Sequence, residues 1–284
     1  MKLNRTQWMV IGGAVVLLLA IYLFADTMKP HKDKPAAPMA NRDGGAKDEP
    51  TFDWQGYMAK VKANISNADT LKLLAAWEKQ GGLDDLLKLR DLYKGRGESV
   101  AEAYYMEQLA LKENELNGKK DTAQLAHAGD LYGATSAISN EPAMHKYLID
   151  KVVESYQKLV EWDSSRTDNR IKLASAYMDQ GTAPMQGVSI LLEIVAKNPN
   201  NADAQFMLGK FGIVSGQFDK AIVRLEKVVS LRPQNYDALF LLAEAYRGKG
   251  DKTKAVELLK RCVALVNKPE LKKEIEQYIK KIQQ

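Results

Sequence analysis

Few side chains in this chain of 284 residues are of the types that perform catalysis, and their spacing matches no common active site. There are three histidines and a single cysteine, Cys262. No two histidines have the spacing of a metal site, and no glycine-rich phosphate loop is present. His127 and Asp130 lie one helical turn apart and could share a proton, although a solvent-exposed pair is the commoner outcome of such spacing. We therefore expect no enzymatic activity and no bound metal or cofactor.

The overall composition argues against two further classes of protein. The 41 basic and 36 acidic residues give a net charge of +5 and are not gathered into a basic patch, so nucleic acid is not an expected partner. One cysteine cannot form an internal disulfide, so the chain is not a disulfide-stapled scaffold. Its fold must be held together by packing in any compartment.

The elements that position any functional side chains are expected to be helices. Beyond Phe52, apolar residues recur at steps of three and four residues, which predicts an all-α fold. The sequence also resembles itself after about 34 residues. The residues that repeat in this way are Leu208 with Leu242, Gly216 with Gly250, Ala221 with Ala255, Leu225 with Leu259, and Val228 with Cys262.

The repeated residues resemble those of the tetratricopeptide repeat (TPR) family. One unit carries Leu208-Gly209, Gly216, Phe218, Ala221, Leu225 and Pro233, the next carries Leu242-Ala243, Tyr246, Gly250, Ala255 and Leu259, and the preceding one carries Leu173-Ala174, Tyr177, Gly181, Leu191, Ile194 and Pro199. The resemblance implies an α-solenoid, a right-handed superhelix of antiparallel helix pairs. We predict a TPR array over 119–284, with units at about 122–166, 167–201, 202–235 and 236–269 and a capping helix at 269–284.

Several residues of these units have a predicted role at helix ends. Each repeat unit consists of a first and a second helix. Gly216 and Gly250 are expected to end the first helix of their units in a left-handed conformation, and Pro199 and Pro233 are expected to follow the second helix of theirs. The unit at 122–166 fits only if residues around 136–146 are an insertion. Residues 51–118 predict a TPR-like region with helices near 53–64, 68–79, 83–94 and 99–117.

The TPR resemblance also implies where a partner binds, because the family lines its concave surface with set positions of each first helix. In this chain those positions include an apolar band beside charged side chains. We predict that the band holds a protein or peptide partner, as an apolar or amphipathic helix lies in a groove. The alternative is that the same side chains pack between helices, which periodicity does not distinguish. The predicted groove residues are Ile171, Lys172, Met178, Phe206, Met207, Lys210, Ile213, Phe240, Leu241, Glu244 and Arg247.

The N-terminal part of the chain has a different composition. Residues 8–25 are eighteen residues without a charge, which is long enough to cross a hydrocarbon core of about 30 Å. We predict a transmembrane anchor after a short basic tail at 1–7. A cleavable signal peptide would need a small residue where Leu23 stands. Residues 26–50 are rich in proline and charge, which predicts a disordered linker.

Two membrane topologies follow from the basic residues around the anchor. Short basic tails such as 1–7 usually stay in the cytoplasm, which places residues 26–284 on the periplasmic side of a bacterial inner membrane. The basic residues after the span, Lys29, Lys32, Lys34 and Arg42, do not favour that orientation. The resemblance therefore implies a membrane-anchored TPR scaffold or adaptor in envelope complex assembly, secretion or biogenesis. The alternatives are a cytosol-facing tethered adaptor, or a co-chaperone or regulatory subunit of a membrane complex.

Overall fold

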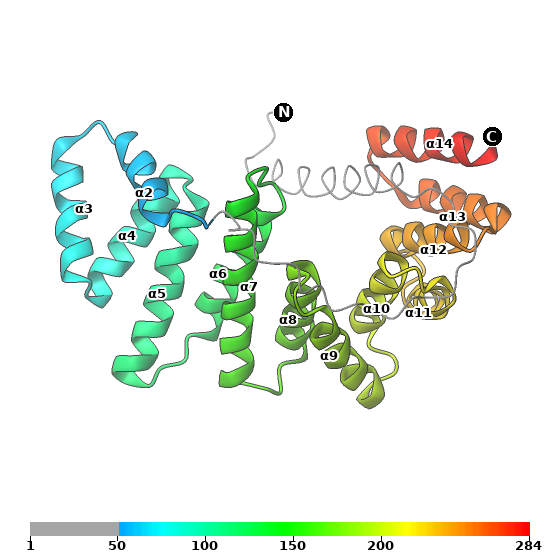
Figure 1. Ribbon diagram of the computed structural model, residues 1–284, viewed down its shortest axis with the longest axis horizontal. Coiled ribbons are helices and arrows are strands. Elements are labelled where there is room, and N and C mark those ends of the chain that lie inside the picture. The colour runs from blue at the N-terminus through cyan, green and yellow to red at the C-terminus, as the bar shows by residue number, and fades with distance from the viewer. Residues whose placement is uncertain (1–50) are drawn as a thin grey trace, which may run out of the picture. The chain divides into compact units, whose positions relative to one another are not determined.

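Helices form all of the regular structure in residues 51–284, which are the residues that the computed structural model describes. Figure 1 shows them following one another along this part of the chain. The prediction of an all-α fold is thus confirmed for these residues. The predicted anchor at 8–25 and linker at 26–50 lie outside the described residues. Within 51–284, every helix is too short or too polar to cross a membrane.

The chain divides into two compact units at the boundary between Trp162 and Asp163. This boundary falls inside residues 119–284, which the sequence analysis treats as a single array. The helices of the first unit are α2 (Trp54–Ala63), α3 (Ala68–Gln80), α4 (Leu83–Arg96), α5 (Ser99–Asn117), α6 (Thr122–Ser136) and α7 (Pro142–Trp162). Those of the second are α8 (Thr167–Gln180), α9 (Pro184–Lys197), α10 (Ala202–Val214), α11 (Phe218–Leu231), α12 (Tyr236–Gly248), α13 (Lys252–Leu265) and α14 (Pro269–Gln283).

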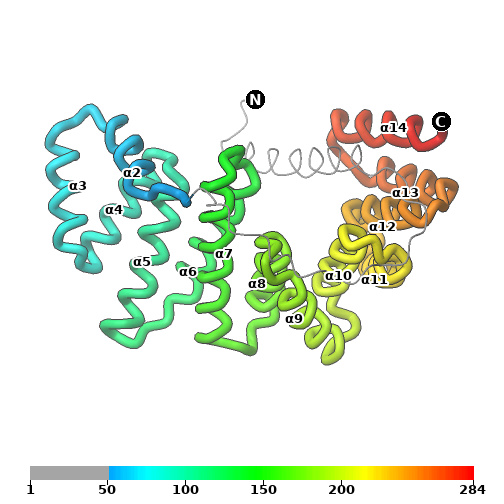
Figure 2. Tube along the Cα trace, in the orientation of Figure 1, coloured from blue at the N-terminus to red at the C-terminus, as the bar shows by residue number. Residues whose placement is uncertain are grey.

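Successive helices pack as antiparallel neighbours, as the tube in Figure 2 shows within each unit. Glycine makes the reversals possible. Gly216 and Gly250 follow α10 and α12 with φ of 72° and 92°, a left-handed conformation that L side chains rarely adopt. The predicted role of these two glycines is confirmed. Pro199 and Pro233 lie just beyond the ends of α9 and α11, where a proline cannot continue the helix.

The helices of a pair approach closely where one of them has no side chain. Gly209 of α10 is buried against Leu225 of α11, and a β-carbon at residue 209 would lie 2.6 Å from the Leu225 Cγ. Gly129 of α6 likewise faces Tyr156 of α7, with a distance of 2.9 Å from such a β-carbon to Cε2. The close approach lets leucine and tyrosine fill the space between the two helices at interior packing density.

The insertion predicted in the unit at 122–166 is not a long loop. The helix α6 continues to Ser136, and α7 begins at Pro142 and extends for 21 residues, against 14 in α9, α11 and α13. Most of the extra residues therefore lengthen the second helix. Pro142 favours the start of α7 at this point, because its fixed φ and missing N–H suit the first position of a helix.

Replacing Gly209 by alanine tests whether the close approach of α10 and α11 contributes to stability. We expect Gly209→Ala to lower the free energy of unfolding by about 1–3 kcal/mol, because the added carbon overpacks the contact with Leu225. The shift in the midpoint of urea unfolding measures this loss.

Gly95 of α4 provides the matched control, since a β-carbon there would meet no atom within 4 Å. Gly95→Ala should leave the protein as stable or stabilise it by about 0.5–1 kcal/mol, the usual gain on replacing glycine within a helix. Equal effects of the two substitutions would contradict the packing role of Gly209.

Candidate protein-binding surface

The first helices of the C-terminal helix pairs lie next to one another. Within residues 163–284, α10 contacts both α8 and α12, whereas the second helices mainly contact the first helices on either side. In a curved stack, the row of helices that approach each other lines the inner side. The inner surface of this unit is therefore built from α8, α10 and α12, the helices that carry the predicted groove residues.

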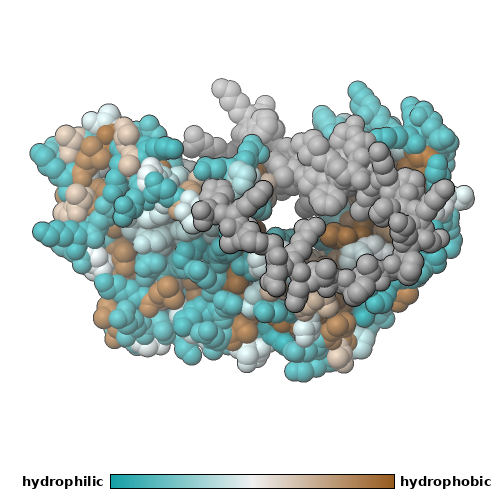
Figure 3. Space-filling model, in the orientation of Figure 1, coloured by the Kyte–Doolittle hydropathy of each residue, from teal (hydrophilic) through white to brown (hydrophobic). Residues whose placement is uncertain are grey.

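The apolar members of the predicted groove are half-buried and fall into two groups. One group packs against a core formed by α8, α9 and α10, and the other packs against a core formed by α11 to α14. Apolar surface is visible over α10 and α12 in Figure 3. The first group contains Ile171, Met178 and Met207, and the second contains Phe206, Ile213, Phe240 and Leu241.

The predicted basic residues on α8 and α10 have different surroundings. Lys172 is exposed and takes part in a polar interaction. Lys210 is half-buried on α10 and makes no ion pair or hydrogen bond with any residue in 51–284. An ammonium group on an apolar surface keeps its charge in contact with water by extending its stem along that surface. Lys210 thus offers an uncompensated positive charge beside Met207 and Phe206.

The predicted charged residues of α12 are engaged inside the protein. Glu244 is only 6% exposed, and its carboxylate accepts hydrogen bonds from Arg247 at 2.9 Å and from the Tyr278 hydroxyl of α14 at 2.6 Å. The ring of Phe240 also packs 6.2 Å from that of Tyr278, measured between centroids. Burial raises the pKa of the Tyr278 hydroxyl, and the negative charge of Glu244 adds to the effect, so this hydroxyl remains a donor.

The helix α14 therefore covers the face of α12 that the sequence analysis assigns to a partner. It occupies the place of the first helix of a further repeat, because Ile275, Ile279 and Ile282 are buried in the same core as Leu242 and Leu259. Tyr278 completes this contact and was not among the predicted site residues. The sequence feature that could have pointed to Tyr278 is its position between Ile275 and Ile279, two of the buried isoleucines of α14. The accessible part of the inner surface is centred on α8 and α10.

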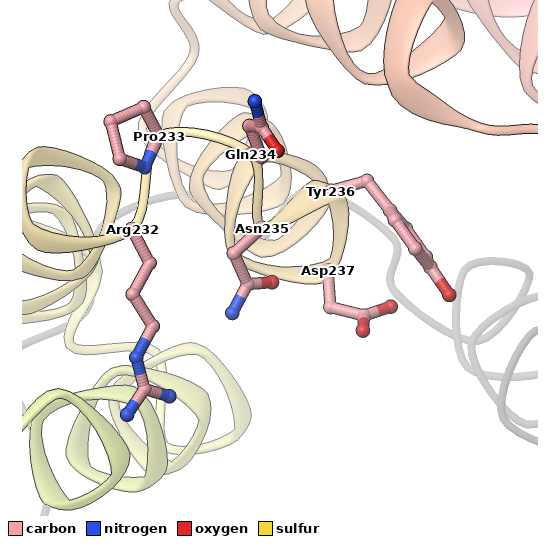
Figure 4. A pocket seen from close by; sticks show the side chains of 6 residues that line it. All are labelled: Arg232, Pro233, Gln234, Asn235, Tyr236 and Asp237. Atoms are coloured by element: carbon pink, nitrogen blue, oxygen red, sulfur yellow. The ribbon is translucent and has the colours of Figure 1, made fainter.

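The turn between α11 and α12 borders an open depression of about 630 Å³, lined by residues 232–237 (Figure 4). Its main polar groups already have partners. Arg232 donates to both carboxylate oxygens of Asp203, at 2.6 and 3.0 Å, and these bonds lower the pKa of Asp203. Asn235 Oδ1 accepts from the backbone N–H of Ala238 and begins α12. These contacts describe a structural turn rather than a ligand site.

The side chains with catalytic chemistry are not assembled into a site in residues 51–284. His127 is exposed, and Asp130 accepts a hydrogen bond from Tyr156 at 2.5 Å. Cys262 is fully buried among the core residues of α12 to α14, and this burial raises the pKa of its thiol to about 11. A protonated, buried thiol is a poor nucleophile. No group of three or more potential metal ligands occurs in the part of the chain that the structure describes.

Comparison with known proteins finds a family match in the C-terminal unit. A sequence profile described as a tetratricopeptide repeat matches residues 213–273, which contain α11, α12 and α13. The solved structure of TTC0263, a thermophilic TPR protein of Thermus thermophilus, is 18% identical and covers 71% of this chain and 98% of its own, with a TM-score of 0.50. Residues 213–273 therefore match the tetratricopeptide repeat family, and the described part of the chain has the helical fold of a solved TPR protein. TPR proteins act in general as scaffolds for protein interactions.

Two other solved structures are similar to this chain at lower TM-scores. MamA from Desulfovibrio magneticus RS-1 is 17% identical, with a TM-score of 0.48 over 64% of this chain and 94% of its own. YrrB, described as a TPR protein with an unusual peptide-binding site, is 17% identical, with a TM-score of 0.45 over 75% of this chain and all of its own. No curated protein matches the sequence.

The hydroxyl of Tyr278 should hold α14, the last helix of the C-terminal unit, in place. We expect Tyr278→Phe to destabilise the protein by about 1–3 kcal/mol, since it removes a donor from the buried carboxylate of Glu244. Amide hydrogen exchange should accelerate in α14 more than in α8.

Tyr236→Phe is the matched control, because the Tyr236 side chain is 37% exposed. It should change neither the unfolding free energy nor the exchange rate of α14 measurably. Unchanged exchange of α14 in Tyr278→Phe would show that apolar packing alone holds this helix.

Proposed function

We propose that this protein is a membrane-anchored scaffold that binds a protein partner along α8 and α10 of its C-terminal unit. The anchor in this proposal is the uncharged segment at 8–25, and the linker is the segment at 26–50. With about 25 residues, a flexible linker has a root-mean-square reach of roughly 25–30 Å, which holds the repeats clear of the lipid headgroups. The partner is a protein or peptide rather than a nucleic acid, because the basic residues are interspersed with acidic ones.

The observation that carries the proposal is the partly exposed apolar surface of α8 and α10. Ile171, Met178 and Met207 pack against the core on one side and keep part of their surface accessible on the other. Methionine suits such a surface, since its flexible thioether adapts to different partner side chains. The unpaired ammonium group of Lys210 beside them favours a partner segment that carries an acidic residue next to its apolar face. An amphipathic helix has this arrangement.

The cellular setting in the proposal is the bacterial envelope. An N-terminal anchor followed by a linker and a TPR unit is the layout of envelope proteins that assist complex assembly, secretion or biogenesis. The short basic tail at 1–7 places the repeats on the periplasmic side of the inner membrane in this proposal. The reverse topology would give a cytosol-facing adaptor with the same binding surface.

Site-specific crosslinking tests the binding surface in the full chain. A photoreactive amino acid at residue 207 should crosslink to a partner protein in living cells. The same group at residue 223 should not, because Val223 is 66% exposed on α11 and lies away from the inner row of helices. Adding Lys210→Glu to the first variant should lower the crosslinked yield about tenfold, which corresponds to about 1.4 kcal/mol of binding energy.

Two results would count against this surface. Equal crosslinking from residues 207 and 223 would indicate nonspecific contact. An unchanged yield in Lys210→Glu would indicate that the positive charge makes no contribution, and the partner would then lack the proposed acidic residue.

Reporter fusions at the C-terminus test the topology separately. Alkaline phosphatase fused after Gln284 should be active and a fluorescent protein fused there should be dark when both are exported through the general secretion route, because the first folds only outside the cytoplasm. Fluorescence without phosphatase activity would establish the cytosol-facing adaptor instead.

A further inference from the structure

The N-terminal unit contains a cleft that is separate from the inner surface of α8 and α10. The cleft lies among α2, α3, α4 and α5 and has a volume of about 490 Å³, within the range of roughly 300–1,000 Å³ that is usual for ligand sites. Its floor consists of the buried side chains of Met58, Leu86, Leu89 and Tyr105. Trp54, Trp77 and Tyr104 form its walls, so three half-buried aromatic rings border an apolar floor.

The wall residues Trp54 and Tyr104 are held in place by contacts with each other and with Tyr105 of the floor. The ring of Trp54 lies 4.4 Å from that of Tyr104, and Tyr104 meets Tyr105 edge to face at 5.1 Å, measured between centroids. The Tyr105 hydroxyl donates to Glu78 Oε1 at 3.0 Å. These contacts fix the rings before any ligand binds, so little side-chain entropy remains to be lost on binding.

The charges of the cleft compensate one another. Glu78 Oε2 accepts from the Lys62 ammonium group at 2.7 Å, so the only acid and the only base among the lining residues form an ion pair. The ammonium group of Lys88 already lies 5.8 Å from the centroid of Trp77, which lessens the attraction of that ring for a second cation. The cleft therefore suits an uncharged ligand.

The remaining polar groups of the cleft suit the backbone of an extended peptide. The side-chain amides of Gln55 and Gln108 border the cleft and make no hydrogen bond within residues 51–284. An amide can donate to a peptide carbonyl while an aromatic ring packs against an apolar side chain. Aromatic grooves with such donors bind proline-rich segments in the polyproline II conformation, whose carbonyl groups are free to accept.

We propose that this cleft binds a proline-rich segment of the same chain, residues 34–38. The segment reads Lys34-Pro35-Ala36-Ala37-Pro38, with two prolines at the spacing that presents both on one side of a polyproline II helix. The small apolar side chains of residues 35–38 match an uncharged aromatic cleft.

The place of this segment in the chain makes the contact feasible. The described residues begin at Thr51, and Trp54, three residues later, already borders the cleft. The residues between Pro38 and Thr51 can span about 40 Å when extended, at about 3.3 Å per residue. A segment tethered this closely has an effective concentration in the millimolar range, so even weak intrinsic affinity keeps the cleft occupied.

When residues 34–38 occupy the cleft, a shorter part of the predicted linker at 26–50 stays free. The part that remains flexible between the predicted anchor and the docked segment then runs only from residue 26 to residue 33. Docking holds the N-terminal unit near the membrane, and release lets the repeats extend away from it. The docking of this segment is independent of the partner surface on α8 and α10, whereas the control of reach rests on the proposed anchor at 8–25.

Fluorine NMR of the full chain in detergent tests the contact. The four tryptophans, Trp8, Trp54, Trp77 and Trp162, are replaced by 5-fluorotryptophan and their resonances assigned with single Trp→Phe variants. The double variant Pro35→Ala/Pro38→Ala should shift the resonances of Trp54 and Trp77 and leave that of Trp162 unchanged. Pro30→Ala/Pro50→Ala, with the same number of prolines removed outside the segment, should shift none of the three.

Titration with a free peptide of residues 30–42 completes the test. The peptide should restore the native resonances of Trp54 and Trp77 in the Pro35→Ala/Pro38→Ala chain. Its apparent affinity for the native chain should be at least about tenfold weaker, because the tethered segment competes at millimolar effective concentration. A peptide with both prolines replaced by alanine should not bind.

Either of two outcomes would overturn the proposal. One is the absence of any shift at Trp54 and Trp77 in the Pro35→Ala/Pro38→Ala chain. The other is equal restoration by the alanine peptide, which would show that the cleft does not recognise proline. Both outcomes can be measured on a folded protein, because the substituted prolines lie outside residues 51–284.

Discussion

The structure depends on one constraint: a helix pair of a solenoid has more apolar surface than its own two helices can cover. Pairs must therefore stack, and the last pair of a stack must be covered by something else. In residues 163–284 this cover is α14, which buries Ile275, Ile279 and Ile282 against α12 and α13 and leaves a charged outer face. In residues 51–162 it is α2, whose Met58 and Val61 pack onto α4 and α5. The two covers differ in length, with 15 residues in α14 and 10 in α2.

Buried glutamates tie neighbouring helices together in both units. Glu244 accepts from Tyr278 and Arg247, and Glu107 of α5 accepts from the Tyr132 hydroxyl of α6 at 2.9 Å and lies 3.5 Å from the Lys151 ammonium group of α7. Burial raises the pKa of Glu107, while Lys151 and the tyrosine hydroxyl act in the opposite direction. A buried carboxylate with one partner missing is costly, so each of these contacts admits only one arrangement of the helices around it. The apolar contacts supply most of the burial, and the polar contacts specify the register.

The repeat sequence was sufficient to predict where most helices begin and end. It was insufficient to predict which element covers the apolar face of each helix. Apolar periodicity and punctuation by glycine predicted the four helices of residues 51–118 to within two residues at each end. The positions of Gly216 and Gly250 followed from the need for a left-handed turn. The burial of Glu244 did not follow, because it depends on Tyr278, which is 34 residues away, and on the way α14 closes the stack. The long α7 was also missed, since an insertion relative to a repeat can extend a helix as readily as a loop. The cleft at Trp54 and Trp77 arises from four helices without clear repeat spacing, so no family pattern points to it.

Both candidate binding surfaces lie where stacking leaves apolar groups incompletely covered. In residues 163–284 the covering helix α14 is long and amphipathic. It packs against Phe240 and Glu244, so a partner cannot reach these two side chains. The accessible apolar surface of that unit is consequently displaced to α8 and α10. In the other unit the aromatic cleft lies among α2, α3, α4 and α5, next to an α2 of only 10 residues. In this chain the short cover is also the helix joined directly to the proline-rich linker, so the segment with the best access to the cleft is the one that precedes it in sequence.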